Sequence, residues 1–439
     1  MKKTLLLVAV MFVTAFVFSQ ETIKAMTYNV VKFAPSSSTD RQLAHEYIYN
    51  DIKPDLLMVQ EAGINTPDHI LGKLNTIENK YLRTTRFNNI SNPSDDNGQL
   101  VFYNKNIFEL VEEKALAAST RNINQYTFRF KKLDINENPV YLEVFVAHLK
   151  SSDGRTNSIE RNNQISTFIQ ALNTVDQSRY IILAGDLNLY TSNEAAYINA
   201  LNGTASIKMK DPIGNAALCE TIPVIDADGS FSWSTYFPTS PTSENIKYFW
   251  RDNINFSSIH TQNPRISSGG LDDRFDFILV SENLMNENSN LSYIPNTYLA
   301  YGNNGNCLNK DVTDASCTGS YSAVTRQHVN YASDHLPVVM DFQFKSSTLS
   351  TYNYSISSIS FASSNVTNSS ILLNINERIL NSELLIYNQL GQVIKSVLIG
   401  NQTGLNKQLN IDVSNLHSGV YFITIKSNNL AKPLKFIMN

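Results

Sequence analysis

One apolar run in the middle of the chain ends in polar side chains: Tyr180-Ile181-Ile182-Leu183-Ala184-Gly185-Asp186-Leu187-Asn188. The run is short and continuously apolar, which predicts a strand. Asp186 and Asn188 then follow at the point where the strand ends. Taken singly, a carboxylate in this position is most often a turn residue or a helix cap, so its meaning depends on the rest of the chain.

Five other segments share this feature of an apolar run with a polar group within it or beside one end. They are Ile23–Val30 with Asn29, Leu56–Val59 with Gln60 and Glu61, Tyr141–Ala147 with His148 and Lys150, Phe275–Val280 with Asp276, and Leu336–Met340 preceded by Ser333, Asp334 and His335. Asp276 is the hardest to explain as a surface residue, because Phe275 and Phe277 flank it. A buried, unpaired carboxylate costs several kcal/mol. His335 is one obvious partner type, and a buried acid with such a partner is a functional-site candidate.

Helix-like segments alternate with these strands. Residues 39–51 and 159–172 have helical periodicity, and in the second Arg161, Gln164 and Phe168 recur at helical spacing. Alternating strands and helices predict an α/β fold for the middle of the chain.

Composition excludes some classes of function. The 439 residues are 42% hydrophobic and 17% charged, which indicates a globular protein, and the net charge is −4. This net charge excludes a polybasic protein that coats nucleic acid. It is compatible with an enzyme that binds phosphate at a local site. The motifs of zinc proteases, of serine hydrolases with a nucleophile elbow and of P-loop enzymes do not occur.

Six strings, in this order, carry a family resemblance. They are Thr27-Tyr28-Asn29, Val59-Gln60-Glu61, Ala147-His148-Leu149-Lys150-Ser151, Ala184-Gly185-Asp186-Leu187-Asn188, Arg274-Phe275-Asp276-Phe277-Ile278-Leu279 and Ser333-Asp334-His335-Leu336-Pro337-Val338. Together they resemble the endonuclease/exonuclease/phosphatase superfamily, which has the deoxyribonuclease I-like fold. The resemblance implies a four-layer α/β sandwich over residues 20–344 and a metal-dependent phosphoric ester hydrolase.

The resemblance also implies a site. Glu61 is the expected metal ligand, with Asn29 and Asp334 nearby, and the expected ion is Mg²⁺, with Mn²⁺ or Ca²⁺ as alternatives. The expected catalytic residues are His148, Asp186, Asn188, Asp276 and His335. His335, oriented by Asp276, would act as general base or polarise the phosphate, while His148 would donate to the phosphate or to the leaving oxygen.

The implied roles of the other residues are less specific. Asp186 and Asn188 would position the attacking water and one phosphate oxygen. The acidic partner that some members provide for the His148-type residue has no clear counterpart in residues 95–99. Lys150, Arg155 and Arg161 could contact phosphates that flank the scissile one, or they could be solvated surface charges.

Substrate is predicted only in outline. Residues 203–270 are rich in aromatics: Phe231, Trp233, Tyr236, Phe237, Tyr248, Phe249, Trp250 and Phe256. Most are expected to be packing residues, and a rim that stacks bases or touches lipid is the sharper alternative. Nucleic acid is the expected substrate. The alternatives are a sphingomyelinase-like or other phosphoester hydrolase, and a non-catalytic binding or adhesive protein on the same scaffold.

Both ends of the chain carry export signals. Residues 1–19 have two lysines, an apolar run and a small residue before Gln20, which predicts a secretory signal peptide; an uncleaved anchor is the alternative. Residues 345–359 read as a Ser/Thr-rich linker, followed at residues 360–439 by short strands that predict a small β-sandwich. The strings Leu385–Val393 and Leu416–Ile423 resemble the sorting domain of type IX secretion cargo.

This second resemblance implies a secreted or cell-surface protein, the type IX secretion machinery as a partner, and no transmembrane anchor after signal cleavage. An ordinary adhesion or carbohydrate-binding sandwich is the alternative. Cys307 and Cys317 share one Gly/Asn-rich loop and are the expected disulfide pair in an oxidising compartment.

Overall fold

The computed structural model describes residues 20–135, 138–192, 194–213, 250–251, 253–263, 270–345, 359–375, 379–402, 407–426 and 434–439. The predicted signal peptide, nearly all of the predicted linker and most of the aromatic-rich region therefore lie outside the described residues. The chain divides into two compact units, Met1–Ser347 and Thr348–Asn439.

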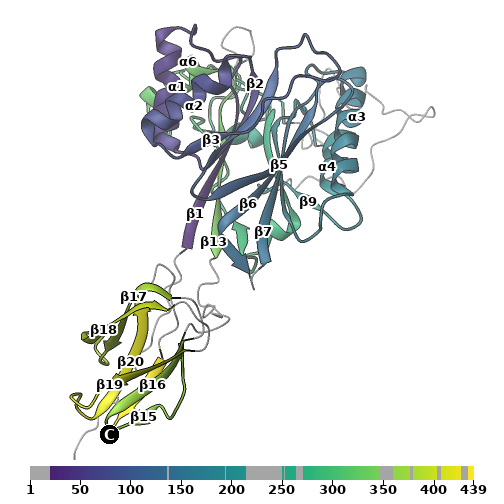
Figure 1. The fold of residues 1–439 in the computed structure, drawn as a ribbon. Coiled ribbons are helices and arrows are strands. Elements are labelled where there is room, and N and C mark those ends of the chain that lie inside the picture. Colours follow the sequence, from purple (N-terminus) through teal and green to yellow (C-terminus); the bar gives the residue numbers. More distant parts are fainter. Residues whose placement is uncertain are drawn as a thin grey trace, which may run out of the picture. The chain divides into compact units, whose positions relative to one another are not determined.

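Two mixed β-sheets form the centre of the first unit (Figure 1). The first sheet has the order β11 (Leu291–Tyr293), β13 (Val338–Lys345), β1 (Gln20–Asn29), β2 (Leu56–Ala62), β4 (Gly98–Asn104) and β3 (Tyr81–Arg83), with β12 (Leu299–Ala300) paired to β13. The second has the order β5 (Phe108–Leu116), β6 (Ile123–Ile135), β7 (Asn138–His148), β8 (Tyr180–Asp186), β10 (Asp276–Ser281) and β9 (Met209–Lys210).

Helices lie on the outer faces of both sheets. The helices α1 (Thr39–Ile52), α2 (Thr66–Ile77) and α6 (Ala323–Ala332) cover the first sheet, and α3 (Arg155–Leu172) and α4 (Ala195–Asn202) cover the second (Figure 1). The first unit also contains the 3₁₀ helices η2 (Ile254–Ile259) and η3 (Glu282–Met285). The four layers confirm the predicted α/β sandwich, and α1 and α3 confirm the two predicted helices.

Alternation along the strands explains the core between the sheets. Side chains at every second position point into one shared apolar layer, because successive side chains of a strand point to opposite faces. This layer includes Ile23, Ala25, Leu56, Met58, Val144, Val146, Ile182, Ala184, Ile278, Val280 and Met340. The other positions of the same strands pack under the helices, so the central strands are buried on both faces.

The second unit is a small β-sandwich, as predicted. One sheet contains β14 (Ile359–Phe361), β16 (Ser370–Ile375) and β19 (Lys407–Asp412). The other contains β15 (Val366–Thr367), β21 (Leu434–Met438), β20 (Gly419–Lys426), β17 (Ile379–Tyr387) and β18 (Val393–Gln402). Both sheets contribute to a separate core that includes Leu373, Ile386, Ile423 and Phe436. In the described part of the chain no helix is long and apolar enough to span a membrane.

Candidate functional site

Polar residues end the apolar layer between the two sheets. Asn29, His148, Asp186 and Asp276 keep the alternation of their strands and thus point into the same space as the apolar side chains below them. His148 of β7 pairs with Asp186 of the parallel strand β8, and Asp186 pairs with Asp276 of the antiparallel strand β10. Three predicted site residues therefore occupy neighbouring positions on adjacent strands.

Glu61 joins this group through an irregularity of β2. It follows Gln60, whose side chain points between the sheets, so strict alternation would turn Glu61 away from the site. Glu61 instead has a φ of 52°, and the pairing of β2 with β4 shifts register here. Its carboxylate meets Asn29, whose Nδ2 donates to Glu61 Oε1 and to Asp186 Oδ2, each at 3.0 Å. The Asn29 amide thus holds together two carboxylates from opposite sheets.

Gly185 and Asn188 shape the end of β8. Gly185 has a φ of 142°, and a Cβ atom there would lie 1.8 Å from the carbonyl oxygen of Ala147. Only glycine fits without moving β7. Asn188 has a φ of 49°; its backbone N–H donates to Asp186 Oδ1 at 3.1 Å, and its Nδ2 donates to the carbonyl oxygen of Leu149 at 3.3 Å.

Asp276 and His335 form the buried pair that the sequence predicts. His335 Nδ1 lies 2.8 Å from Asp276 Oδ2, and His335 Nε2 lies 3.7 Å from Asp186 Oδ2. Burial by itself lowers the pKa of His335, but the charges of Asp276, Asp186 and Asp334 outweigh it and hold that pKa well above its ordinary value. His335 therefore carries a proton at neutral pH in this arrangement.

For Asp186 and His148, burial is the largest cause of the pKa shift. It is the main reason why the pKa of Asp186 rises to about 7; His335 opposes this rise, while the negative charges of Asp276 and Glu61 add to it. Burial also lowers the pKa of His148 well below its ordinary value, assisted by the positive charges of Arg121 and His335. His148 is therefore neutral at pH 7.

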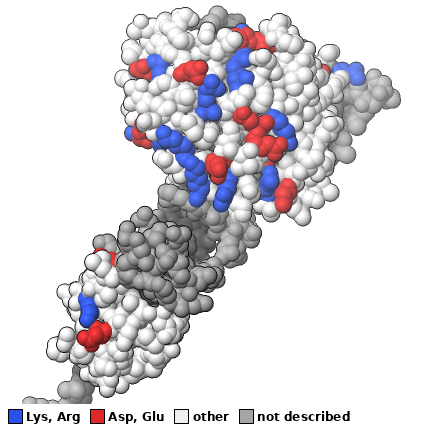
Figure 2. Space-filling model, viewed as in Figure 1, with Lys and Arg blue, Asp and Glu red and all other residues white. Residues whose placement is uncertain are grey.

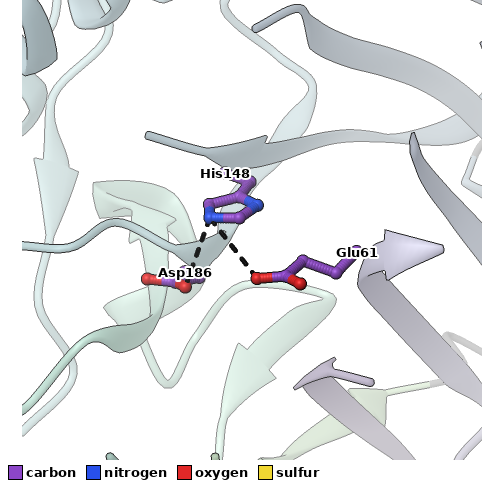
Figure 3. A group of neighbouring side chains, drawn as sticks. All are labelled: Glu61, His148 and Asp186. Carbon is purple, nitrogen blue, oxygen red and sulfur yellow. Dashed lines mark ion pairs between the residues drawn. The ribbon is translucent and has the colours of Figure 1, made fainter. Parts of the chain in front are cut away.

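Glu61, His148 and Asp186 form a group suited to a divalent cation (Figure 3). Their ligand atoms all lie within 4.8 Å of one another, and His148 Nε2 is 3.9 Å from Glu61 Oε1 and 3.5 Å from Asp186 Oδ2. Two crowded carboxylates and a neutral imidazole provide the oxygen and nitrogen donors that such ions take. The negative charges of Asp276 and Glu61 add to the rise in the pKa of Asp186 that burial causes, and a cation would relieve this repulsion.

The predicted metal ligands are thus brought together only in part. Glu61 belongs to the group, whereas Asn29 directs its amide N–H toward the carboxylates and its Oδ1 accepts from the backbone N–H of Val31 at 3.2 Å. Asp334 is half-buried next to His335, and its Oδ1 lies 3.5 Å from the Ser333 hydroxyl. His148 and Asp186 were predicted as catalytic residues, not as ligands, because sequence order does not show which strand ends face each other.

The three predicted phosphate contacts occupy different environments. Arg155 is exposed at the first turn of α3, and Lys150 is partly buried with its Nζ 2.9 Å from the carbonyl oxygen of Ser151. Arg161 is fully buried and forms two hydrogen bonds with Glu194. The prediction that Arg161 contacts a phosphate is therefore wrong, because its guanidinium has no access to solvent.

Two residues near the site had no signal in the sequence. Arg121 donates through Nη1 to the carbonyl oxygen of Leu149 at 2.9 Å, next to His148. Thr261 accepts the backbone N–H groups of Phe275 and Asp276 on its Oγ1, each at 3.1 Å. Neither residue lies at the end of an apolar run, so the strand-end pattern could not identify them.

Two further expectations concern aromatics and cysteines. Trp250 is buried against Tyr197 and Phe277 in the core under α3 and α4, which agrees with a packing role. Of the other aromatics named above, Phe256 is partly buried against the same core and the rest lie outside the described residues. Cys307 and Cys317 form the expected disulfide.

Comparison with known families identifies the C-terminal unit. Residues 365–439 match the secretion system C-terminal sorting domain, which confirms the resemblance seen in the sequence. The protein is therefore exported by type IX secretion to the cell surface or the exterior. None of the curated protein sequences matches the chain.

Several solved structures are similar to this one at low sequence identity. The human Nocturnin catalytic domain with bound sulfate is 17% identical, with 74% of this chain and 97% of that chain covered and a TM-score of 0.44. An endonuclease/exonuclease/phosphatase from Beutenbergia cavernae is 12% identical, with coverages of 95% and 100% and a TM-score of 0.43. Another from Bacteroides vulgatus is 14% identical, with coverages of 74% and 99% and a TM-score of 0.43.

Proposed function

We propose that the first unit is a secreted, divalent-metal-dependent phosphodiesterase that hydrolyses extracellular nucleic acid. The observation that carries this proposal is the convergence of strand ends from both sheets on one buried cluster. Asn29 and Glu61 come from the first sheet, His148, Asp186 and Asp276 from the second, and His335 from the segment that precedes β13. This cluster combines an acid with a raised pKa, a protonated histidine, a neutral histidine and a candidate cation site.

Phosphodiester hydrolysis requires such a combination. The reaction needs an in-line water and compensation of negative charge on the phosphate oxygens. A divalent cation at Glu61, His148 and Asp186 would supply part of that compensation. Mg²⁺ is the proposed ion, with Mn²⁺ or Ca²⁺ as alternatives.

The chain's own residues divide the proton chemistry. His335, charged through its pairing with Asp276, is suited to polarise a phosphate oxygen. Asp186, ionised as a ligand of the cation, would orient the attacking water, and the backbone N–H of Asn188 fixes its Oδ1. The Nε2 atom of neutral His148 can take one of two roles: it can bind the cation, or it can donate a hydrogen bond to the phosphate or to the leaving oxygen.

Export and surface charge bear on the substrate. An exported enzyme meets nucleic acid released outside the cell, and the net charge of −4 gives no general attraction to it. On the face shown in Figure 2, Lys and Arg side chains are interspersed with Asp and Glu. The described residues of this face therefore form no continuous basic track along which nucleic acid could bind.

The test compares four substrates: plasmid DNA, RNA, sphingomyelin and bis-p-nitrophenyl phosphate, each with Mg²⁺ or Mn²⁺ and each repeated with EDTA. We expect metal-dependent cleavage of DNA or RNA, and loss of cleavage in a folded His335→Ala variant. Preferential cleavage of sphingomyelin would favour the lipid phosphodiesterase. No turnover on any substrate would favour a binding protein on this scaffold.

A further inference from the structure

The buried pair of Arg161 and Glu194 lies behind the proposed site. Both side chains are completely buried, with Arg161 Nε 2.8 Å from Glu194 Oε2 and Arg161 Nη2 3.0 Å from Glu194 Oε1. Burying two charges is costly unless their geometry is good and their remaining donors are satisfied. A buried ion pair often adds little to the free energy of unfolding, so the other contacts of Arg161 and Glu194 are better evidence of what the pair does.

The remaining donor of Arg161 binds the loop that follows β7. Nη1 donates to the carbonyl oxygens of Lys150 and Ser152, at 2.9 and 2.8 Å. Gln164, one turn further along α3, accepts the backbone N–H of Lys150 on its Oε1 at 2.8 Å. The residue two positions after His148 is thus fixed through both its N–H and its C=O by one helix.

Glu194 binds the loop that follows β8. Its Oε1 accepts the backbone N–H of Tyr190 at 3.0 Å, and the Arg161 guanidinium lies over the Tyr190 ring at 5.4 Å. Tyr190 is two residues after Asn188. One ion pair therefore connects α3 to the loops that follow both central site strands.

These two loops are also connected next to the site. The backbone N–H of Leu149 donates to the carbonyl oxygen of Asp186 at 2.9 Å, and Asn188 Nδ2 donates to the carbonyl oxygen of Leu149 at 3.3 Å. A shift of either loop would thus change the position of His148 relative to Asp186. Through these hydrogen bonds of the described residues, the pair of Arg161 and Glu194 is connected to His148, Asp186 and Asn188.

We propose that Arg161 and Glu194 are positioning residues that set the geometry of His148, Asp186 and Asn188 without touching the substrate. This inference rests on the proposed phosphodiesterase function. Small displacements of catalytic groups cost far more in rate than in folding energy, since a shift of about 1 Å can lower the rate about a hundredfold. The pair should therefore affect kcat more than it affects stability or KM.

The test uses the full exported chain with Arg161→Lys, Glu194→Gln and a control, Arg179→Lys. Lysine keeps the charge of Arg161 but cannot make the two-pronged contact with Glu194 together with two carbonyl contacts. Glutamine keeps the shape of Glu194, which protects against simple unfolding. Arg179 pairs with the buried Glu143 in the same sheet, but it precedes β8 and so lies at the opposite end of the strand from Asp186.

Turnover of bis-p-nitrophenyl phosphate and amide hydrogen exchange are measured well below the Tm of each variant. We expect kcat to fall about tenfold to a hundredfold in both site variants, with KM changed by no more than about twofold. Exchange should increase in residues 149–154 and 188–192 and not in β10. Arg179→Lys should lower Tm without this loss of kcat.

Two results would overturn the proposal. One is unchanged exchange in both loops of Arg161→Lys and Glu194→Gln; the other is a loss of kcat no larger than that of Arg179→Lys. If the wild-type protein turns over no phosphoester, the proposed function fails. The exchange data distinguish that failure, because they test the connection between the loops without any reaction.

Discussion

Asp276 and His335 are buried together, and each stabilises the charge of the other. Replacing Asp276 with Asn removes the main attraction that raises the pKa of His335, while burial still lowers it. We expect Asp276→Asn to lower kcat/KM on the order of a hundredfold, the scale of one acid–base group. Because the protonated form of His335 is lost at a lower pH, the alkaline limb of the pH–rate profile should also move to lower pH.

The matched control for this prediction is Asp341→Asn. Asp341 is a partly exposed acid of β13 that pairs with Lys24 of β1. The kcat/KM and pH profile of this variant should match those of the wild type. A profile of Asp276→Asn that keeps the wild-type alkaline limb would contradict the charged role of His335.

His45 is a buried histidine of α1, remote in sequence from the site residues. Its Nδ1 lies 3.1 Å from the Tyr49 hydroxyl and its Nε2 lies 3.2 Å from the carbonyl oxygen of Ala332. Burial, and then the charge of Arg41, lowers its pKa well below the ordinary value. Below about pH 6.5, His45 is therefore protonated in the unfolded chain but stays neutral in the folded chain. The free energy of unfolding decreases as the pH falls below that value.

Chemical unfolding from pH 7.5 to pH 5 tests this prediction. The slope contributed by His45 approaches about 1.4 kcal/mol per pH unit. His45→Gln should be less stable at pH 7.5 but should lose less stability on acidification. Comparing the two proteins is essential, since the raised pKa of His335 acts in the opposite direction. Parallel pH curves would refute the assignment.

At the scale of elements, β7 and β8 are held at a distance that only Gly185 permits. A Cβ atom at Gly185 would overlap the Ala147 carbonyl at 1.8 Å, and the φ of 142° is itself unfavourable for other residues. We expect Gly185→Ala to destabilise the protein by about 3 kcal/mol and to abolish activity, because His148 and Asp186 would move apart.

Gly72 in α2 is the control for this substitution. Apart from the adjoining residues and the backbone of its own helix, a Cβ atom added to Gly72 would have no atom within 4 Å, and the residue is helical. Gly72→Ala should raise stability by about 0.5–1 kcal/mol through helix propensity, with activity unchanged. Equal unfolding midpoints for the two variants would show that the strands can separate without cost.

Sequence reasoning succeeded where an element's own pattern determines the outcome. The apolar runs that end in Asp186 and His148 identify buried strands and their polar ends, and the spacing of Arg161, Gln164 and Phe168 identifies one face of α3. It failed where the outcome depends on a neighbouring element. The periodicity of α3 does not show that Glu194 lies opposite Arg161. The apolar run of β2 does not predict the positive φ of Glu61, which turns this side chain toward the site.

At the scale of the whole molecule, the two units have separate cores. Residues of the first unit fill the layers on both sides of its two sheets, whereas the second unit has its own core around Leu373 and Ile423. We expect a protein that ends at Lys345 to keep its kcat within about twofold, because it retains every proposed site residue. Its export should be lost, since the sorting domain is removed.

Activity assays on purified protein and the amount of protein in culture medium check this pair of outcomes. A shortened protein that is folded but inactive would show that the sorting domain contributes to catalysis. Export of the shortened protein at the wild-type level would show that residues 365–439 do not contain the export signal.

The distribution of the site over the sequence controls when activity can appear. Asn29 lies in the first strand and His335 directly before β13, the last strand of the first unit, so the chemistry is complete only after the entire unit has folded. A newly made chain that has not yet folded therefore lacks the assembled cluster. Under the proposed function, such a chain would not cleave nucleic acid.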